Sequence, residues 1–119
     1  MDQRSEIERA ISLFIEAINS NDASRIPLTD DVVMSGPMMP EPTIGQAEVR
    51  QYIDETSPFI AHMELKTTLI DDDRAAIIME FTGLNGVVIE GARFLRFRDG
   101  KISSDQNFFD SRPLFKGAN

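Results

Sequence analysis

The sequence predicts an α+β fold in which N-terminal helices cover one face of a curved antiparallel sheet. Two observations lead to this prediction. Apolar residues before His62 recur at the 3.6-residue spacing of helices, whereas after it they alternate with polar residues, as in half-buried strands. Short turn sequences divide the alternating half into four runs, which indicates an antiparallel meander.

The first helix is predicted by a single apolar stripe. Ser5 with Glu8 fits a capping box at its start, although Asp2 is a second candidate for the cap. The polar run 19–21 ends the helix. The stripe consists of Ile7, Ile11, Phe14, Ile15 and Ile18.

Two shorter helices and a short strand follow. Asp22 can cap a short helix that runs through Leu28, and residues 32–34 form a strand. A third helix over residues 47–53 ends before Pro58, because the residue that precedes a proline disfavours helical backbone. The loop before this third helix is rich in proline and is therefore rigid.

The alternating half predicts strands over residues 62–69, 75–82, 87–98 and 101–109. Side chains of one strand alternate between the two faces of the sheet, so every second residue lies on the same side. In the first strand the apolar members of one row are Met63, Leu65, Thr67 and Leu69.

Turn length decides which rows face inward. We interpret Arg98-Asp99-Gly100 as a three-residue loop, which places Arg93 directly opposite Asp105. Leu84-Asn85-Gly86, interpreted in the same way, pairs Gly83 with Val87. In that register the side chains of Ile77, Met79 and Phe81 point inward and that of Glu80 points outward. A two-residue Asn85-Gly86 turn is the alternative, and it would bury Glu80 instead.

The predicted register brings Arg93, Asp105 and Asn107 together on an otherwise apolar concave face. A buried guanidinium needs an anionic partner, and Asp105 is the candidate. The pair either closes one end of the core as a structural ion pair or lines a pocket. The residues that we expect to line such a pocket are Phe14, Met34, Met38, Met39, Tyr52, Met63, Met79, Phe81, Leu95 and Phe109.

Length and composition fit one domain, residues 1–119. The chain is 41% hydrophobic and 27% charged, which is the balance of an ordinary folded protein that can bury a core. The absence of Cys excludes a disulfide scaffold, a thiolate zinc site and a thiol nucleophile. Because His62 is the only histidine, a multi-histidine metal site is excluded too. We therefore expect no metal and no nucleotide or redox cofactor.

The net charge of −8 argues against a nucleic-acid or membrane partner, because either would need a positive face. The first residues are amphipathic and acidic, without the charged-then-apolar layout of a secretion signal, and no apolar run approaches membrane-spanning length. These features predict a cytoplasmic protein.

Several segments, taken in order, resemble the nuclear transport factor two-like superfamily, which includes ketosteroid isomerases and SnoaL-like polyketide cyclases. They are Leu28-Thr29-Asp30-Asp31-Val32, Gly36-Pro37, Glu41-Pro42, Gly45, Val49-Arg50-Gln51-Tyr52, Phe97-Arg98-Asp99-Gly100-Lys101-Ile102 and Phe108-Phe109-Asp110. The resemblance covers essentially the whole chain. It implies a cystatin-like α+β barrel: a cone-shaped mixed sheet, formed by the meander plus a short N-terminal strand, wrapped around the N-terminal helices. It also implies a deep apolar pocket and, in many members, a dimer.

The catalytic residues of the enzymes in this superfamily are not present as complete sets at the matching positions of this chain. Ketosteroid isomerases use a Tyr, a general base and a protonated Asp, and these positions match Phe14, Gly36 and Arg93. Steroid isomerisation by that mechanism is therefore not expected. The His and Asp pattern of SnoaL-like cyclases is absent, since His62 starts a strand on its outer side. Arg93 with Asp105 resembles part of the Asp-Arg-Asp cluster of limonene epoxide hydrolases, but Leu95 replaces the second Asp.

Three functions remain open from the sequence. The first is binding of a mostly apolar small molecule, whose oxygen anion or carbonyl would contact Arg93, held in place by Asp105. The second is an enzyme of the isomerase, cyclase, dehydratase or epoxide hydrolase type. In it Asp105 would be the base, Arg93 its orienting cation and Asn107 a hydrogen-bonding group. The third is a protein-interaction module with a vestigial pocket.

The outer face of the sheet predicts a homodimer. Phe94 and Phe108 would be exposed there in a monomer, and soluble proteins usually cover such a patch. The predicted register places Glu90 opposite Phe108. The alternative is that residues 111–119 fold back over the face, with Leu114 and Phe115 against it. The other apolar members of the patch are Ile78, Val88 and Ala92.

Overall fold

The structure is a computed structural model that describes residues 2–116. It has the predicted α+β architecture, with a curved mixed sheet of six strands in the order β2-β1-β6-β5-β4-β3. Strands β1 and β6 pair in parallel, and the other neighbours are antiparallel. The strands are β1 (Leu28–Ser35), β2 (Thr43–Ile44), β3 (Ile60–Asp71), β4 (Arg74–Gly83), β5 (Val88–Arg98) and β6 (Lys101–Phe109).

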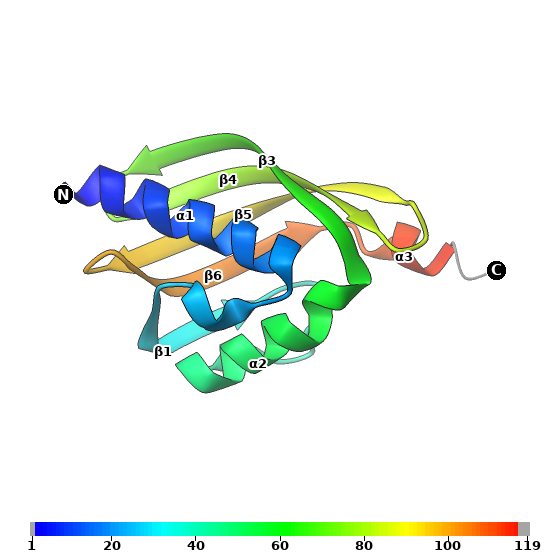
Figure 1. Ribbon diagram of the computed structural model, residues 1–119, viewed down its shortest axis with the longest axis horizontal. Coiled ribbons are helices and arrows are strands. Elements are labelled where there is room, and N and C mark those ends of the chain that lie inside the picture. The colour runs from blue at the N-terminus through cyan, green and yellow to red at the C-terminus, as the bar shows by residue number, and fades with distance from the viewer. Residues whose placement is uncertain (1, 117–119) are drawn as a thin grey trace.

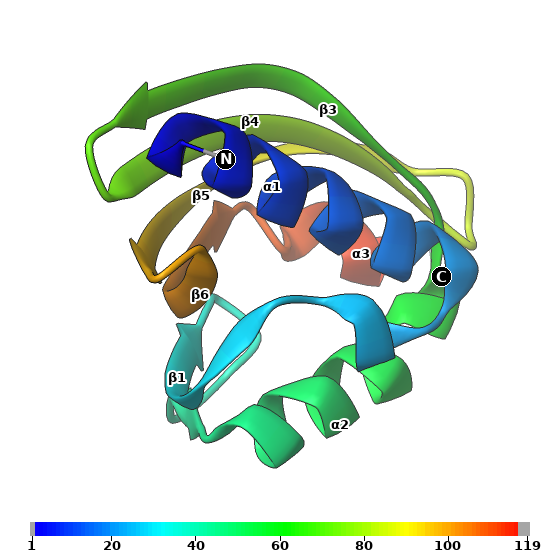
Figure 2. The same cartoon turned by 60° about the vertical axis from the view of Figure 1, so that its left-hand side comes forward.

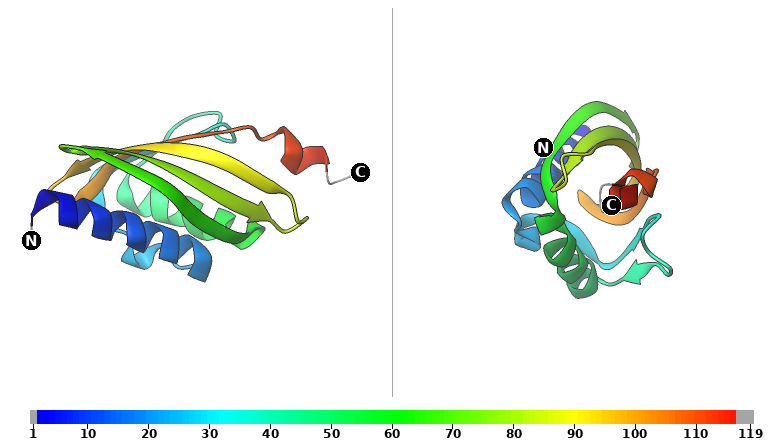
Figure 3. Two further views of the ribbon diagram at one scale, coloured as in Figure 1. Left: turned by 90° about the horizontal axis from the view of Figure 1, so that it is seen from above. Right: turned by 90° about the vertical axis from the view of Figure 1, so that its right-hand side faces the viewer.

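The helices lie on the concave side of the sheet and at its open end. Helix α1 runs across the concave face, and α2 lies beside β1 (Figure 1, Figure 2). Viewed along the long axis, the sheet curls around the space on its concave side, and α3 follows the C-terminal end of β6 (Figure 3). The helical elements are α1 (Gln3–Ser20), η1 (Ala23–Arg25), α2 (Gln46–Thr56), η2 (Ser57–Phe59) and α3 (Arg112–Lys116). Among residues 2–116, no helix has the length and hydropathy needed to span a bilayer.

Helix α1 is capped by Asp2, the second candidate of the sequence analysis, and not by a capping box of Ser5 and Glu8. The Asp2 carboxylate accepts a hydrogen bond of 2.7 Å from the Ser5 backbone N–H, so Ser5 already lies inside the helix. Asn21 ends the helix in the left-handed conformation, with φ of 57°. The predicted stripe is buried against the sheet, except that Ile15 is only partly covered.

The helix predicted from Asp22 to Leu28 is wrong beyond its first turn. Asp22 caps only the short 3-10 turn η1, and Ile26 is already extended. Pro27 has no N–H to donate to a helix, and its carbonyl instead accepts from the Ile102 N–H at 2.8 Å. Leu28 therefore starts β1, which is longer than the predicted strand over residues 32–34.

A bulge in β3 corrects the row predicted for that strand. Pairing with β4 shifts between Leu65 and Thr67, so that Thr68 lies opposite Ile77. The extra residue turns the remainder of the strand over. Leu69, which the simple alternation grouped with Met63 and Leu65, is 67% exposed, while Ile70 packs against the core.

The hairpin between β5 and β6 also differs from the prediction. Its loop has two residues, Asp99 and Gly100, both with positive φ, and Arg98 pairs with Lys101. A bulge then shifts the ladder between Arg96 and Phe97. The shorter loop and the bulge each shift the partner on β6 by one residue in the same direction, so beyond the bulge the partners differ from the prediction by two residues, a shift that keeps each side chain on its face. The inner and outer faces therefore agree with the prediction, whereas the partners do not.

The new partners in this hairpin are Asn107 opposite Arg93, Asp105 opposite Leu95, and Phe108 opposite Ala92. Glu90 pairs with Glu80 on β4 and not with Phe108. The other hairpin, between β4 and β5, forms as predicted. The Val87 carbonyl accepts a hydrogen bond of 2.8 Å from the Gly83 N–H, which faces Ile77, Met79 and Phe81 inward and Glu80 outward.

Candidate functional site

A cavity of about 420 Å³ lies between the concave face of the sheet, the C-terminal half of α2 and the loop that follows β1. Two of the lining side chains, Met38 and Phe59, are 46% and 69% exposed, so the cavity reaches the surface beside them. The lining residues are Met34, Ser35, Gly36, Pro37, Met38, Met39, Tyr52, Thr56, Phe59, Ile60, Met63, Phe81, Arg93, Asn107, Phe109 and Leu114. Apolar side chains dominate this set, as in most small-molecule sites.

Arg93 and Asp105 form a buried ion pair at the inner wall of the cavity. Arg93 Nη1 lies 2.7 Å from Asp105 Oδ2, and the side chains are 9% and 2% exposed. The Arg93 Cζ atom also lies 4.7 Å from the centre of the Phe14 ring, on the face of the ring that attracts cations. The expectation that Arg93 and Asp105 meet on the concave face is thus confirmed.

Arg93 lines the cavity, but Asp105 lies behind it. Asp105 is buried by its neighbours and is not among the lining residues. On the parallel side of β6, Met34 is its strand partner. Asp105 therefore holds the guanidinium from the protein side, while Arg93 presents the guanidinium to the cavity.

Several polar atoms at this wall have no hydrogen-bond partner among the described residues. They are Arg93 Nε, Asp105 Oδ1 and Asn107 Oδ1. Buried polar atoms normally find partners, because an unsatisfied one costs about 1–3 kcal/mol. This group of unsatisfied atoms beside an apolar cavity marks the wall as the polar end of the candidate site.

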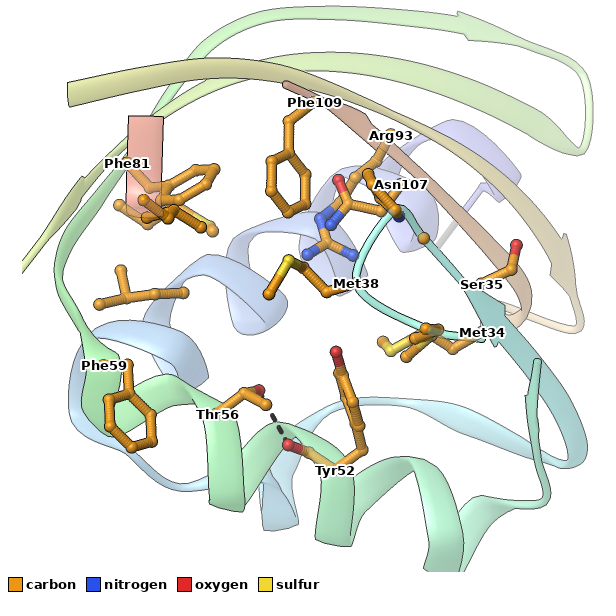
Figure 4. A pocket seen from close by; sticks show the side chains of 16 residues that line it. Met34, Ser35, Met38, Tyr52, Thr56, Phe59, Phe81, Arg93, Asn107 and Phe109 are labelled. Atoms are coloured by element: carbon orange, nitrogen blue, oxygen red, sulfur yellow. Dashed lines mark hydrogen bonds between the residues drawn. The ribbon is translucent and has the colours of Figure 1, made fainter. Parts of the chain in front are cut away.

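Tyr52 supplies a second polar group from α2. Its side chain points into the cavity toward the part occupied by the Arg93 guanidinium (Figure 4). Burial raises the pKa of the Tyr52 hydroxyl above its ordinary value, and the Arg93 charge opposes this effect only in part. The hydroxyl is therefore protonated at neutral pH and can donate a hydrogen bond.

The sequence predicted most of the lining. Among the predicted pocket residues, those that line the cavity are Met34, Met38, Met39, Tyr52, Met63, Phe81, Arg93, Asn107 and Phe109. Four others are buried around the ion pair or beneath the cavity without lining it, namely Phe14, Met79, Leu95 and Asp105.

The lining residues that the sequence did not predict come from three places. Ser35, Gly36 and Pro37 lie at the end of β1 and in the loop after it. Thr56, Phe59 and Ile60 come from the junction of α2 with β3, and Leu114 comes from α3. The alternative to a dimer, in which residues 111–119 cover the outer face, is wrong for Leu114, because Leu114 lines the cavity. The Phe115 side chain and residues 117–119 lie outside the described part. Pro58 marked the junction after α2, and no comparable signal marked α3.

A curved mixed sheet wrapped over an N-terminal helix, with an apolar cavity inside the cone, defines the architecture of the nuclear transport factor two-like proteins. Residues 11–104 match the model of the SnoaL-like domain. The chain therefore belongs to the SnoaL-like domain family. No curated protein matches the chain.

Solved structures show the same fold at low sequence identity. An NTF2-like protein of unknown function from Mesorhizobium loti has a TM-score of 0.80 and 17% identity, over 92% of this chain and 95% of that one. A proposed SnoaL-like polyketide cyclase from Jannaschia sp. CCS1 has a TM-score of 0.80 and 10% identity, over 95% and 91% of the two chains. A protein with a ketosteroid isomerase-like fold from Catenulispora acidiphila, in complex with trimethylamine, has a TM-score of 0.76 and 15% identity, over 85% of each chain.

Proposed function

We propose that this protein binds a mostly apolar small molecule in the cone cavity and that Arg93 recognises an oxygen atom of that molecule. The observation that carries the proposal is the placement of one guanidinium at the wall of a cavity otherwise lined mainly by apolar side chains. Asp105 fixes the guanidinium at 2.7 Å, so Arg93 is already oriented before a ligand arrives. A group fixed in this way loses little entropy on binding.

Binding is favoured over catalysis by the ionisable groups within reach of a ligand. Of the lining residues in the described part, only Arg93 and Tyr52 ionise. A base-catalysed reaction needs a carboxylate or imidazole within hydrogen-bond reach of the substrate. Asp105, the base of the alternative hypothesis, lies behind Arg93 and shares its Oδ2 with it. The alternative of a vestigial pocket is disfavoured by the volume of the cavity.

The four methionines of the lining also fit a binding role. Met34, Met38, Met39 and Met63 contribute flexible, polarisable side chains to one cavity. Unbranched thioether side chains adapt to ligands of different shape more readily than branched aliphatic ones. The wall made by Arg93 and Asn107 would then orient the ligand, and the methionines would accommodate its apolar body.

Tyrosine fluorescence tests this proposal directly, because Tyr52 is the only tyrosine and the chain has no Trp. We would titrate 2-decalone and decalin-2-carboxylate, neither of which is aromatic. A saturable change with at least one of them is expected, and Arg93→Met/Asp105→Leu should weaken it. The matched control is Arg74→Met/Asp71→Leu, which removes an exposed ion pair at the β3–β4 turn and should bind like wild type. No saturable change with either compound would reject the proposal.

We also propose that the protein is a homodimer through the outer face of the sheet. Phe108 and Val88 are 52% and 56% exposed on this face, and Ala92 lies directly opposite Phe108. Phe94 is partly covered and has the Arg96 guanidinium 5.5 Å from its ring centre. A second copy would cover these apolar groups, with the charged side chains between them as a polar rim.

A further inference from the structure

The charges around the cavity cancel. Arg93 is the only lining residue, in the part of the chain that the structure describes, that is charged at neutral pH. Its charge is matched by that of Asp105, whose Oδ2 lies 2.7 Å from Nη1. An anionic ligand would therefore bring one uncompensated negative charge into an apolar space. Burial of such a charge costs far more than burial of a neutral polar group.

Hydrogen-bond donors nevertheless remain at the wall. Arg93 Nη1 donates to Asp105, which leaves the other guanidinium nitrogens, and Nε has no partner. The Tyr52 hydroxyl points toward the same part of the cavity from α2 (Figure 4). A neutral oxygen placed between these two residues can accept from both, and the bond from the charged guanidinium is stronger than a bond between neutral groups.

Tyr52 also reports how the cavity treats an oxygen anion. Ionisation of its phenol places a negative oxygen in the cavity, beside the position proposed for the ligand oxygen. Burial raises the pKa of this hydroxyl, and the attraction of Arg93 does not reverse the effect. Burial in this part of the cavity thus disfavours a negative oxygen by more than the Arg93 charge favours it.

We propose that the cavity selects neutral ligands that carry a carbonyl or similar uncharged oxygen acceptor between Arg93 and Tyr52, and that it discriminates against carboxylates; this inference rests on the proposed function. The sequence allowed a ligand with either an oxygen anion or a carbonyl oxygen, and this inference restricts the ligand to the carbonyl type. It also gives Asp105 a specific role: Asp105 is a positioning residue that cancels the charge of Arg93 and thereby sets ligand selectivity.

Three probes of nearly equal shape test the selectivity: 2-acetylnaphthalene, 2-naphthoate and 2-isopropenylnaphthalene. They differ only in offering a neutral oxygen acceptor, an anion or no oxygen. Methionines labelled with ¹³C in the methyl group give the readout by NMR, because Met34, Met38, Met39 and Met63 line the cavity while Met79 is fully buried outside the lining. Concentration-dependent shifts confined to the first four measure binding in the cavity.

The ketone should bind at least about tenfold more tightly than the naphthoate, and about tenfold more tightly than the alkene. Equal or tighter binding of the naphthoate would overturn the charge argument. Equal binding of the alkene would overturn the hydrogen-bond argument. Failure of the charge argument leaves the proposed function standing. Failure of the hydrogen-bond argument leaves binding in the cavity standing but removes the recognition of an oxygen by Arg93. The absence of shifts with all three probes would reject the proposed function together with this inference.

Asp105→Asn tests the role of Asp105 itself. The amide keeps the size and an acceptor for Arg93 but removes the cancelling charge, so the preference should move toward the naphthoate by at least about tenfold relative to the ketone. An unchanged preference in the folded variant would overturn the role. If this variant does not fold, Arg93→Met/Asp105→Leu replaces the pair by apolar groups, and the preference for the ketone over the alkene should then fall, because only the Tyr52 hydroxyl still donates. An undiminished ketone preference in the double variant would overturn the inference.

Discussion

The guanidinium of Arg93 reaches Asp105 diagonally across two strands. Directly opposite Arg93 on β6 lies Asn107, and directly opposite Asp105 on β5 lies Leu95. Nη1 nevertheless approaches Oδ2 to 2.7 Å, because an Arg side chain is long enough to span the diagonal between neighbouring strands. Asn107 consequently lines the cavity beside Arg93, while Asp105 stays beneath it.

Breaking this pair on one side should cost much more than replacing both partners. Arg93→Gln leaves the Asp105 carboxylate buried without a cation, and we expect the free energy of unfolding to fall by about 3–5 kcal/mol. Arg93→Met/Asp105→Leu should recover most of that loss. Urea denaturation measures both, and equal losses in the single and double variants would contradict the expectation.

The cavity should shift the ionisation of Tyr52. Its pKa is raised by burial, so the folded protein holds the phenolic proton more tightly than the unfolded chain. The stabilisation from this group is complete below the ordinary tyrosine pKa near 10 and is lost as the pH rises through the higher pKa of the folded state. Because Tyr52 is the only tyrosine, ultraviolet absorbance follows it without overlap. A midpoint at or below the ordinary value would contradict the burial described here.

Asn19 should anchor the end of α1 to the cavity strand. Its Nδ2 donates to the Met63 carbonyl at 2.9 Å, and its Oδ1 accepts from the Met63 N–H at 2.8 Å. Asn19→Asp removes the donor and places a negative oxygen against that carbonyl, so we expect a loss of about 1–3 kcal/mol in urea denaturation. Ser20→Ala, at the neighbouring exposed position, is the control and should remain within about 0.5 kcal/mol of wild type. Similar losses in both variants would show that the contact is not specific.

Phe94→Glu should convert the proposed dimer to a monomer. A carboxylate in the middle of the apolar patch would be buried without a partner if the two outer faces met. Light scattering of the wild type and the variant measures the change in mass. A wild-type protein that is monomeric at high micromolar concentration would rule out this interface.

Steroid isomerase activity should be at background. Phe14, Gly36 and Arg93 stand at the positions that match the three catalytic groups of ketosteroid isomerases, and none of them is a hydroxyl or carboxyl group. Absorbance of the conjugated product formed from a β,γ-unsaturated ketosteroid provides the assay. Robust turnover would show that another group serves as the base.

The sequence predicted the concave face better than it predicted the strand partners. Alternation depends on every second residue being apolar, a signal spread over many positions, whereas the partners depend on the count of residues in one turn. The prediction places Arg93 and Asp105 on the right face with the wrong partners, because the short Asp99-Gly100 turn and the later bulge together shift the register by two residues, which is one full period of the strand. Neither serine at positions 103 and 104 signals a bulge.

The bulge in β3 also escaped the sequence pattern, and no second register shift returns the later residues to their predicted face. The alternation of Met63, Leu65, Thr67 and Leu69 looks regular in sequence, yet the ladder shifts after Leu65. The missed lining residues have a different cause. Phe59 and Leu114 reach the cavity through the curvature of the sheet, which brings the ends of distant elements together, and local periodicity does not encode curvature.

The exposed mouth of the cavity has a consequence for divergence within this fold. Met38 and Phe59 line the cavity yet remain in contact with solvent, so their replacement removes little buried apolar area. The residues that stabilise the cone, such as Ile11 and Leu95, are fully covered and do not touch the cavity. For the proposed binding role, new specificities can therefore arise by substitution at the mouth with little loss of folding stability, whereas replacement of Arg93 or Asp105 alone alters specificity and stability together.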